Sequence, residues 1–163
     1  MSCAVFFGSL GAVNAAGLEV TFTAPDKYID IRPGDENQHH YNETVFYNIR
    51  KQLTKLAEDL PDDQLLKVDI VNIDLAGDIR MTGNGLIRVI SQMYSPYFKF
   101  TYQLEDKDKK VIVQGEEAIR DKSFMTGTSL RYRNEYLGYE KQLFDDWFEE
   151  TFVDTNMVKK EQD

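Results

Sequence analysis

The sequence predicts an α+β fold, with a single mixed or antiparallel sheet of about five strands in the order β-α-β-β-β-β-α. Two amphipathic helices are expected to pack on one face of this sheet. Short segments that alternate apolar and polar residues predict the strands, two longer segments with apolar residues every three or four positions predict the helices, and an Asn-Gly pair predicts a tight hairpin. The chain has 163 residues, of which 42% are hydrophobic and 29% charged, as is typical of one globular domain.

The first strand is predicted at residues 18–23, where apolar and polar residues alternate. Segment 26–41 has neither the strand period nor the helix period, so we expect a long surface loop. A helix is predicted over 42–60, with Asn42 as its N-cap, because apolar residues recur at helical spacing until Pro61.

The second strand is predicted at residues 65–75, with a bulge near Ile70, where the apolar phase slips. If the strands on either side of the first helix are neighbours, the connection makes them parallel, with a right-handed crossover. A hairpin is predicted next, with 79–82 and 86–90 flanking the Asn-Gly turn at 83–85.

A second hairpin is predicted from 98–104 and 110–114, joined by the polar turn 106–109. Residues 122–133 are expected to form a loop. The last helix is predicted over 134–152, where aromatic residues recur at steps of three and four. Packing on the sheet explains this aromatic stripe better than a ligand site does.

The N-terminus has the pattern of a signal peptide. Residues 4–13 form an apolar run too short to span a bilayer, and the small residues that follow allow cleavage after Ala15. No Lys or Arg precedes the run, so we expect the true translation start to lie upstream. A buried N-terminal helix is the alternative, which Gly8, Gly11 and the lack of a polar face disfavour.

We therefore expect a signal peptide at 1–15, a single α+β domain at 16–155 and a polar tail at 156–163, with the mature protein in the periplasm and no membrane span in it. Cleavage would remove Cys3, the only cysteine, and with it any disulfide or thiolate metal site. The net charge of −9 opposes binding to nucleic acid.

Several short motifs occur in one order along the chain: Asp30-Ile31-Arg32-Pro33, Leu60-Pro61, Asp74-Leu75-Ala76-Gly77, Ile87-Arg88-Val89, Pro96, Arg120-Asp121, Tyr139-Glu140-Lys141 and Asp145-Asp146-Trp147-Phe148. In this respect the chain resembles the bacterial family called domain of unknown function 3016. The resemblance implies an exported protein of Gram-negative bacteria, but no activity, ligand or catalytic residue. The chain departs from the family pattern at Lys109, where a hairpin glycine is common, and in a short stretch between Gly77 and Leu86.

Asp69, Asp74 and Asp78 gather around the end of the second predicted strand, and their oxygens could hold a hard cation such as Ca²⁺. No calcium-loop pattern accompanies them, and aspartates commonly end strands by accepting hydrogen bonds from nearby backbone. A divalent cation is therefore the less favoured interpretation, and no cofactor is predicted.

Arg120, Arg131 and Arg133 could converge as a small anion site between the loop and the last helix. Salt bridges are the favoured interpretation, because acidic residues lie close in the sequence: Asp121, Glu140 and Asp145.

The two histidines, His39 and His40, are adjacent, so in an extended loop they point to opposite sides and chelate one metal poorly. No Ser-His-Asp set or glycine-rich phosphate loop is recognised in the sequence. We favour a non-enzymatic periplasmic protein that binds a ligand or associates with the envelope. A metal-dependent enzyme that uses the aspartate cluster and a subunit of an envelope complex are the alternatives.

Overall fold

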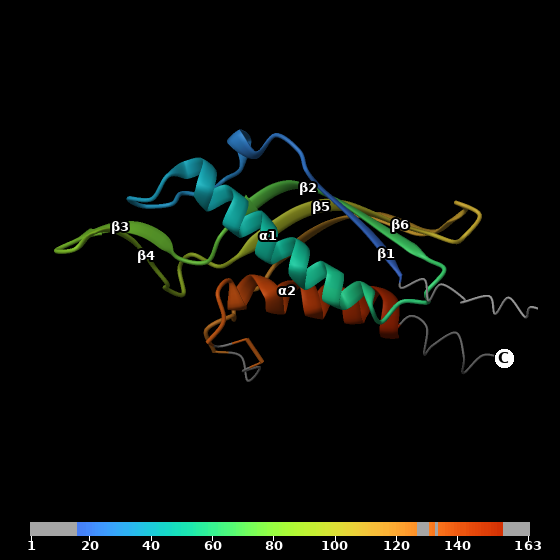
Figure 1. Cartoon of the computed structure of the whole chain (residues 1–163). Helices are drawn as coiled ribbons and strands as arrows, with labels where there is room; N and C mark the ends of the chain where they lie inside the picture. The colour runs from blue at the N-terminus through green and yellow to red at the C-terminus, as the bar shows by residue number, and fades with distance from the viewer. Residues whose placement is uncertain (1–15, 127–130, 133, 155–163) are drawn as a thin grey trace, which may run out of the picture.

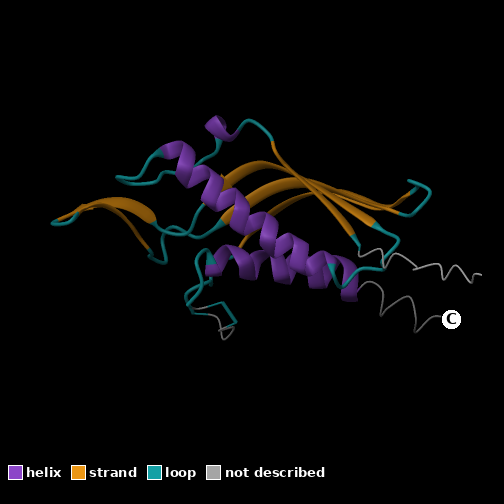
Figure 2. Ribbon diagram, in the orientation of Figure 1, coloured by secondary structure: helices purple, strands orange, loops and turns teal. Residues whose placement is uncertain are grey.

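A four-stranded mixed sheet and two helices form the body of the protein (Figure 1). The strands lie side by side in the order β1-β2-β5-β6. Both helices lie on the same side of this sheet, as expected, and neither covers its opposite face (Figure 2). The elements of this body are β1 (Gly17–Phe22), α1 (Gln38–Ala57), β2 (Leu65–Asp74), β5 (Tyr97–Glu105), β6 (Val111–Arg120) and α2 (Gly138–Phe148).

This computed structural model describes residues 16–126, 131–132 and 134–154. The predicted signal peptide at 1–15, the polar tail at 156–163 and the candidate residue Arg133 lie outside the described residues. Within the described part of the chain, each helix is too short or too polar to cross a membrane.

The predicted parallel crossover is confirmed, because β1 pairs in parallel with β2 and α1 connects the two. The other two pairings in this sheet, β2 with β5 and β5 with β6, are antiparallel. The predicted bulge is also confirmed, since the register of β2 against β5 shifts between Ile70 and Asn72.

The prediction of one sheet of about five strands is wrong, because the Asn-Gly hairpin forms a sheet of its own. Its strands, β3 (Asp78–Thr82) and β4 (Gly85–Val89), pair with each other and project beyond the end of the larger sheet (Figure 1). Gly77 turns the chain after β2 with a φ of 83°, a conformation that favours glycine. The turn sequence specifies which two strands pair, but not which sheet they join.

Helix α1 begins earlier than the sequence predicts, and helix α2 begins later. Helix α1 begins at Gln38, and the side chain of Asn37 caps it by accepting a hydrogen bond from the His40 N–H at 3.1 Å. The two histidines therefore lie in the first turn of a helix and not in a loop. Helix α2 begins at Gly138, where a Cβ would collide with the carbonyl oxygen of Tyr132. It continues as a π-helical segment, η2 (Glu149–Asp154).

The core lies between the sheet and the two helices. Alternate residues of β2 and β5 face the helices, as do the apolar stripes of α1 and α2; its fully buried members include Val45, Leu53, Leu66, Ile70, Phe98, Phe100 and Phe144. The ring of Trp147 meets that of Phe100 edge-on, with centroids 4.8 Å apart. The aromatic stripe of the last helix thus packs on the sheet, as the sequence predicts.

Candidate functional site

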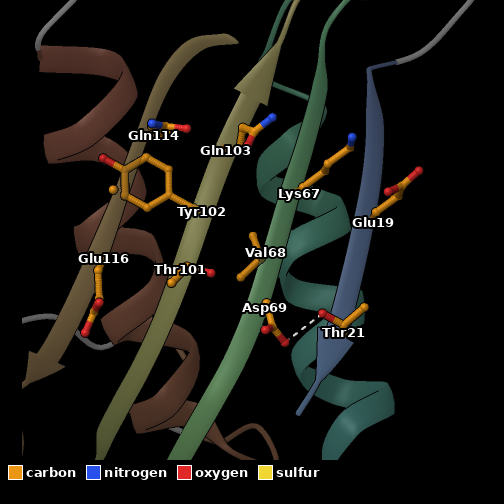
Figure 3. Close-up of a pocket in the computed structure, with 11 residues that line it drawn as sticks. Glu19, Thr21, Lys67, Val68, Asp69, Thr101, Tyr102, Gln103, Gln114 and Glu116 are labelled. Atoms are coloured by element: carbon orange, nitrogen blue, oxygen red, sulfur yellow. Dashed lines mark hydrogen bonds between the residues drawn. The ribbon is translucent and has the colours of Figure 1, made fainter. Parts of the chain in front are cut away.

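The face of the four-stranded sheet away from the helices carries a polar depression, which we call the sheet groove (Figure 3). Its volume is about 550 Å³. Side chains from all four strands stand along it, including Glu19, Thr21, Lys67, Asp69, Gln103 and Glu116. Successive residues of a strand face opposite sides of the sheet, so these polar residues face away from the helices while their apolar neighbours are buried in the core.

Three charged side chains of the sheet groove, Asp69, Lys67 and Glu116, have partners within the sheet. Asp69 accepts hydrogen bonds from the hydroxyls of Thr21 and Thr23, at 2.7 and 2.8 Å. Lys67 forms an ion pair with Glu105 at 2.8 Å, and Lys99 forms one with Glu116 at 2.7 Å. A solvated sheet face accounts for this groove without a ligand.

A larger cavity of about 940 Å³ lies between the β3–β4 hairpin, segment 33–36, segment 121–125 and the start of α2. We call it the hairpin cavity. Five aromatic side chains line it: Tyr41, Phe124, Tyr132, Tyr136 and Tyr139. Aliphatic side chains of the hairpin and its exit, Leu86, Ile87 and Ile90, add to the apolar wall. Cavities of this size and composition are typical of sites that enclose small molecules.

The segment before α1 contacts the β3–β4 hairpin and holds it in place beside this cavity. The carboxylate of Asp35 accepts a hydrogen bond from the Leu86 N–H at 2.7 Å. Gly34, with a φ of 73°, packs directly against the Leu86 carbonyl, where a Cβ would collide. At the base of the hairpin, Arg32 donates to Asp78 at 2.7 Å.

Arg88, on β4, is the one basic side chain among the described residues of the cavity wall, and it is only 15% exposed. Its guanidinium donates to both carboxylate oxygens of Asp30, at 3.1 and 3.2 Å. It also donates to the carbonyls of Arg32 and Gly77, at 3.1 and 3.2 Å. Its Nε–H is buried and has no hydrogen-bond partner among the described residues. Arg88 thus joins the hairpin to the end of β2 and to the segment before α1.

Asp30 is the acidic partner at the centre of this network, with a side chain only 8% exposed. Besides Arg88, it accepts hydrogen bonds from the backbone N–H and the Nε of Arg32, both at 3.0 Å. Burial by itself raises the pKa of Asp30, but the hydrogen bonds from Arg32 and Arg88 outweigh it and hold the pKa below its usual value. Asp30 is therefore ionised at neutral pH.

Glu140, in the first turn of α2, is a buried acid on the wall of the cavity. Only 3% of it is exposed, and its Oε1 accepts a hydrogen bond from the Ala76 N–H at 2.8 Å. Burial raises the pKa of Glu140, and the Ala76 N–H and the charge of Arg88 offset only part of this effect. Glu140 therefore holds a proton more tightly than an exposed glutamate does.

The structure does not bring the three candidate metal ligands together. Asp69 lies in the sheet groove, Asp74 accepts a hydrogen bond from Arg120 at 3.3 Å, and Asp78 accepts one from Arg32 at 2.7 Å. Among the residues that the structure describes, no three acidic, histidine or cysteine side chains are grouped so that they could hold a metal ion.

The candidate arginines likewise have separate partners. Arg120 lies over the ring of Tyr97, 4.7 Å from its centroid, and forms its ion pair with Asp74. Arg131 forms an ion pair with Asp145 at 2.7 Å. Arg120 and Arg131 therefore belong to different ion pairs.

Asp30, Arg88 and Glu140 are not among the site residues predicted from the sequence. All three lie in the short motifs that carry the family resemblance, and folding brings these motifs to one place: Asp30 meets Arg88, Arg88 meets Gly77, and Glu140 meets Ala76. The order of these motifs along the chain was the signal that could have found them.

Comparison with family models matches residues 16–150 to a family described as "Protein of unknown function (DUF3016)". The match confirms the resemblance seen in the short motifs. Neither a search of curated proteins nor a search of solved structures gave a match.

Proposed function

Since this chain belongs to the DUF3016 family, whose description assigns no activity, we propose from its own geometry that it is a non-enzymatic protein that binds a small organic ligand in the hairpin cavity. The single observation that carries the proposal is the cavity itself. It has a volume of about 940 Å³, aromatic and aliphatic walls, and a small number of buried polar groups. This is the usual composition of a small-molecule site.

The buried polar groups of the cavity suit recognition better than proton transfer. Arg88 is held by Asp30 and by three backbone carbonyls, and Glu140 by a backbone N–H. Tyr136 is 46% exposed, partial burial raises the pKa of its hydroxyl, and this group can donate a hydrogen bond. Groups held in this way orient a bound molecule and have little freedom to exchange protons with it.

We propose further that the protein acts in the periplasm. The signal-peptide pattern of residues 1–15 supports this, and the family match begins at residue 16, directly after the expected cleavage site. Strand β1 begins at Gly17, so cleavage would leave the described fold intact. Sequencing the N-terminus of the protein from a periplasmic extract tests the proposal: Ala16 is the expected first residue, and Met1 on a folded product would contradict it.

The binding proposal is tested with three probes that share a phenylbutyl body: 4-phenylbutylamine, 4-phenyl-1-butanol and 4-phenylbutyrate. We expect isothermal titration calorimetry to detect binding of at least one of them. The substitution Leu86→Trp fills part of the cavity and should abolish that binding. The matched control Val111→Trp introduces the same side chain at an exposed position of β6 and should leave it unchanged.

Two outcomes would contradict the binding proposal. One is that none of the three probes binds. The other is that binding survives Leu86→Trp in a protein that still unfolds cooperatively, because the ligand would then lie elsewhere.

A further inference from the structure

The charges around the hairpin cavity are strongly unequal in sign. Among the described residues that line it, six are acidic and one, Arg88, is basic; the acids are Asp35, Glu36, Asp121, Glu135, Glu140 and Asp146. The positive charge of Arg88 is already balanced by Asp30, which accepts from it through both carboxylate oxygens. The described lining residues therefore carry a net negative charge, while Lys55 lies over the ring of Tyr132, 5.5 Å from its centroid.

Most of the hydrogen bonds made by these acids do not cancel their charge. Asp35 accepts from a backbone N–H of the hairpin, Asp121 from the Ser123 N–H, and Asp146 from the side-chain amide of Gln142. These donors are neutral, so each carboxylate keeps its negative charge. Glu135 differs, because it forms an ion pair with Lys141 at 2.7 Å.

The aromatic rings of the cavity wall also favour a positively charged ligand. The rings of Phe124 and Tyr139 meet edge-on at 90°, with centroids 4.7 Å apart, so they hold one another in place on the cavity wall. The face of an aromatic ring is negative and attracts a cation that lies within about 6 Å of its centroid. The ring faces of such a wall therefore favour a cation over an anion.

At Tyr136 the cavity wall combines an aromatic ring with nearby acidic residues. Its ring lines the cavity, and the pKa of its hydroxyl lies above the usual value because of burial, its neighbour Tyr41 and the nearby charges of Glu36 and Glu140. Glu36 and Glu140 line the same cavity as this ring. This arrangement is suited to an ammonium group, which can contact the ring face and a carboxylate at once.

We propose that the ligand of the hairpin cavity is a small organic cation. Its apolar body lies against the aromatic and aliphatic wall, and its ammonium group lies near Tyr136, Glu36 and Glu140. This inference rests on the proposed function, because it names the chemical class of the ligand that the same cavity takes.

The three phenylbutyl probes test the inference directly, because they share their body and differ in the charge of the head group at pH 7. We expect 4-phenylbutylamine to bind at least about tenfold more tightly than 4-phenyl-1-butanol, and 4-phenylbutyrate to bind most weakly. Raising the salt concentration should weaken binding of the amine and leave that of the alcohol unchanged.

Two variants locate the ammonium group. Glu36→Gln, at an exposed position, should weaken amine binding about fivefold and leave alcohol binding unchanged. The control Glu19→Gln removes an equally exposed acid from the sheet groove and should change neither affinity.

The results separate the two proposals. If the alcohol or the butyrate binds as tightly as the amine, and Leu86→Trp abolishes that binding, the ligand is not a cation but the cavity remains a binding site. If none of the probes binds, or if binding survives Leu86→Trp, both proposals fail.

Discussion

The sheet groove and the hairpin cavity are both depressions lined by charged side chains, but their charges are organised in different ways. In the groove, regular strands place polar residues in rows, and Lys67 and Lys99 find their acidic partners on neighbouring strands. In the cavity, Arg88 and Asp30 come from segments 58 positions apart and are largely buried. The difference shows that neighbouring strands can give a lysine its acidic partner locally. The acids of the cavity come from separate segments and accept mostly from neutral donors beside an apolar wall.

The largest effect expected from this comparison is that of removing the buried arginine. Arg88→Ala leaves Asp30 buried with only Arg32 as its charged partner and removes the bonds that join the hairpin to the body. We expect a loss of about 3 kcal/mol in the free energy of unfolding, measured by urea denaturation.

Lys99→Ala, beside the sheet groove, is the matched control for that substitution. Lys99 and its partner Glu116 are both exposed, with 43% and 59% of their side chains accessible, so the loss of Lys99 should leave the urea midpoint unchanged within error. Similar losses in the two variants would mean that the two depressions do not differ as described.

A smaller effect, with a defined sign, is expected for Glu140→Gln. Because burial raises the pKa of Glu140 in the folded protein, its protonated form favours folding. The wild-type protein should therefore lose stability as the pH rises from the unfolded pKa of about 4.3 through the higher folded value. The glutamine variant should lack this loss and be relatively more stable at pH 7.

Thermal unfolding of both proteins between pH 4 and pH 8 measures this difference. Asp30 contributes in the opposite direction, because its lowered pKa gives stability that is lost as the pH falls, and this part of the profile should be the same in both proteins. A variant whose stability relative to wild type does not increase with pH would contradict the burial of Glu140.

The smallest effect is expected in the sheet groove itself. Thr21→Val removes one of the two hydroxyl groups that donate to Asp69, while Thr23 remains and the side chain stays β-branched. The free energy of unfolding should change by no more than about 0.5 kcal/mol, again by urea denaturation. A much larger loss would show that the groove has a role beyond that of a solvated sheet face.

Much of the fold could be predicted because its signals are local. The alternation in 65–75 and 98–104 predicts two central strands, and the helical spacing after Asn42 predicts α1. The start of α1 was placed four residues late, because the polar first turn at 38–41 carries no apolar period. Capping by Asn37 decided the start instead, and residue type alone does not distinguish Asn37 from Asn42 as the cap.

The candidate site could not be predicted in the same way. Asp69, Asp74 and Asp78 are close in the sequence, but the bulge in β2 and the turn at Gly77 send them to different partners. Closeness in the sequence therefore did not predict that these three side chains lie close together in space. The sequence also gave no indication of the hydrogen bond from the Ala76 N–H to Glu140, because the two residues are 64 positions apart.

The sequence by itself determined the secondary structure, the parallel crossover through α1, the Asn-Gly turn and the membership of the DUF3016 family. The tertiary structure alone decided that the hairpin forms its own sheet, and that Asp30, Arg88 and Glu140 meet beside an acidic, aromatic cavity. The physical reason is that periodicity records which side of each element is buried, whereas the partner on that side is chosen by packing between distant segments.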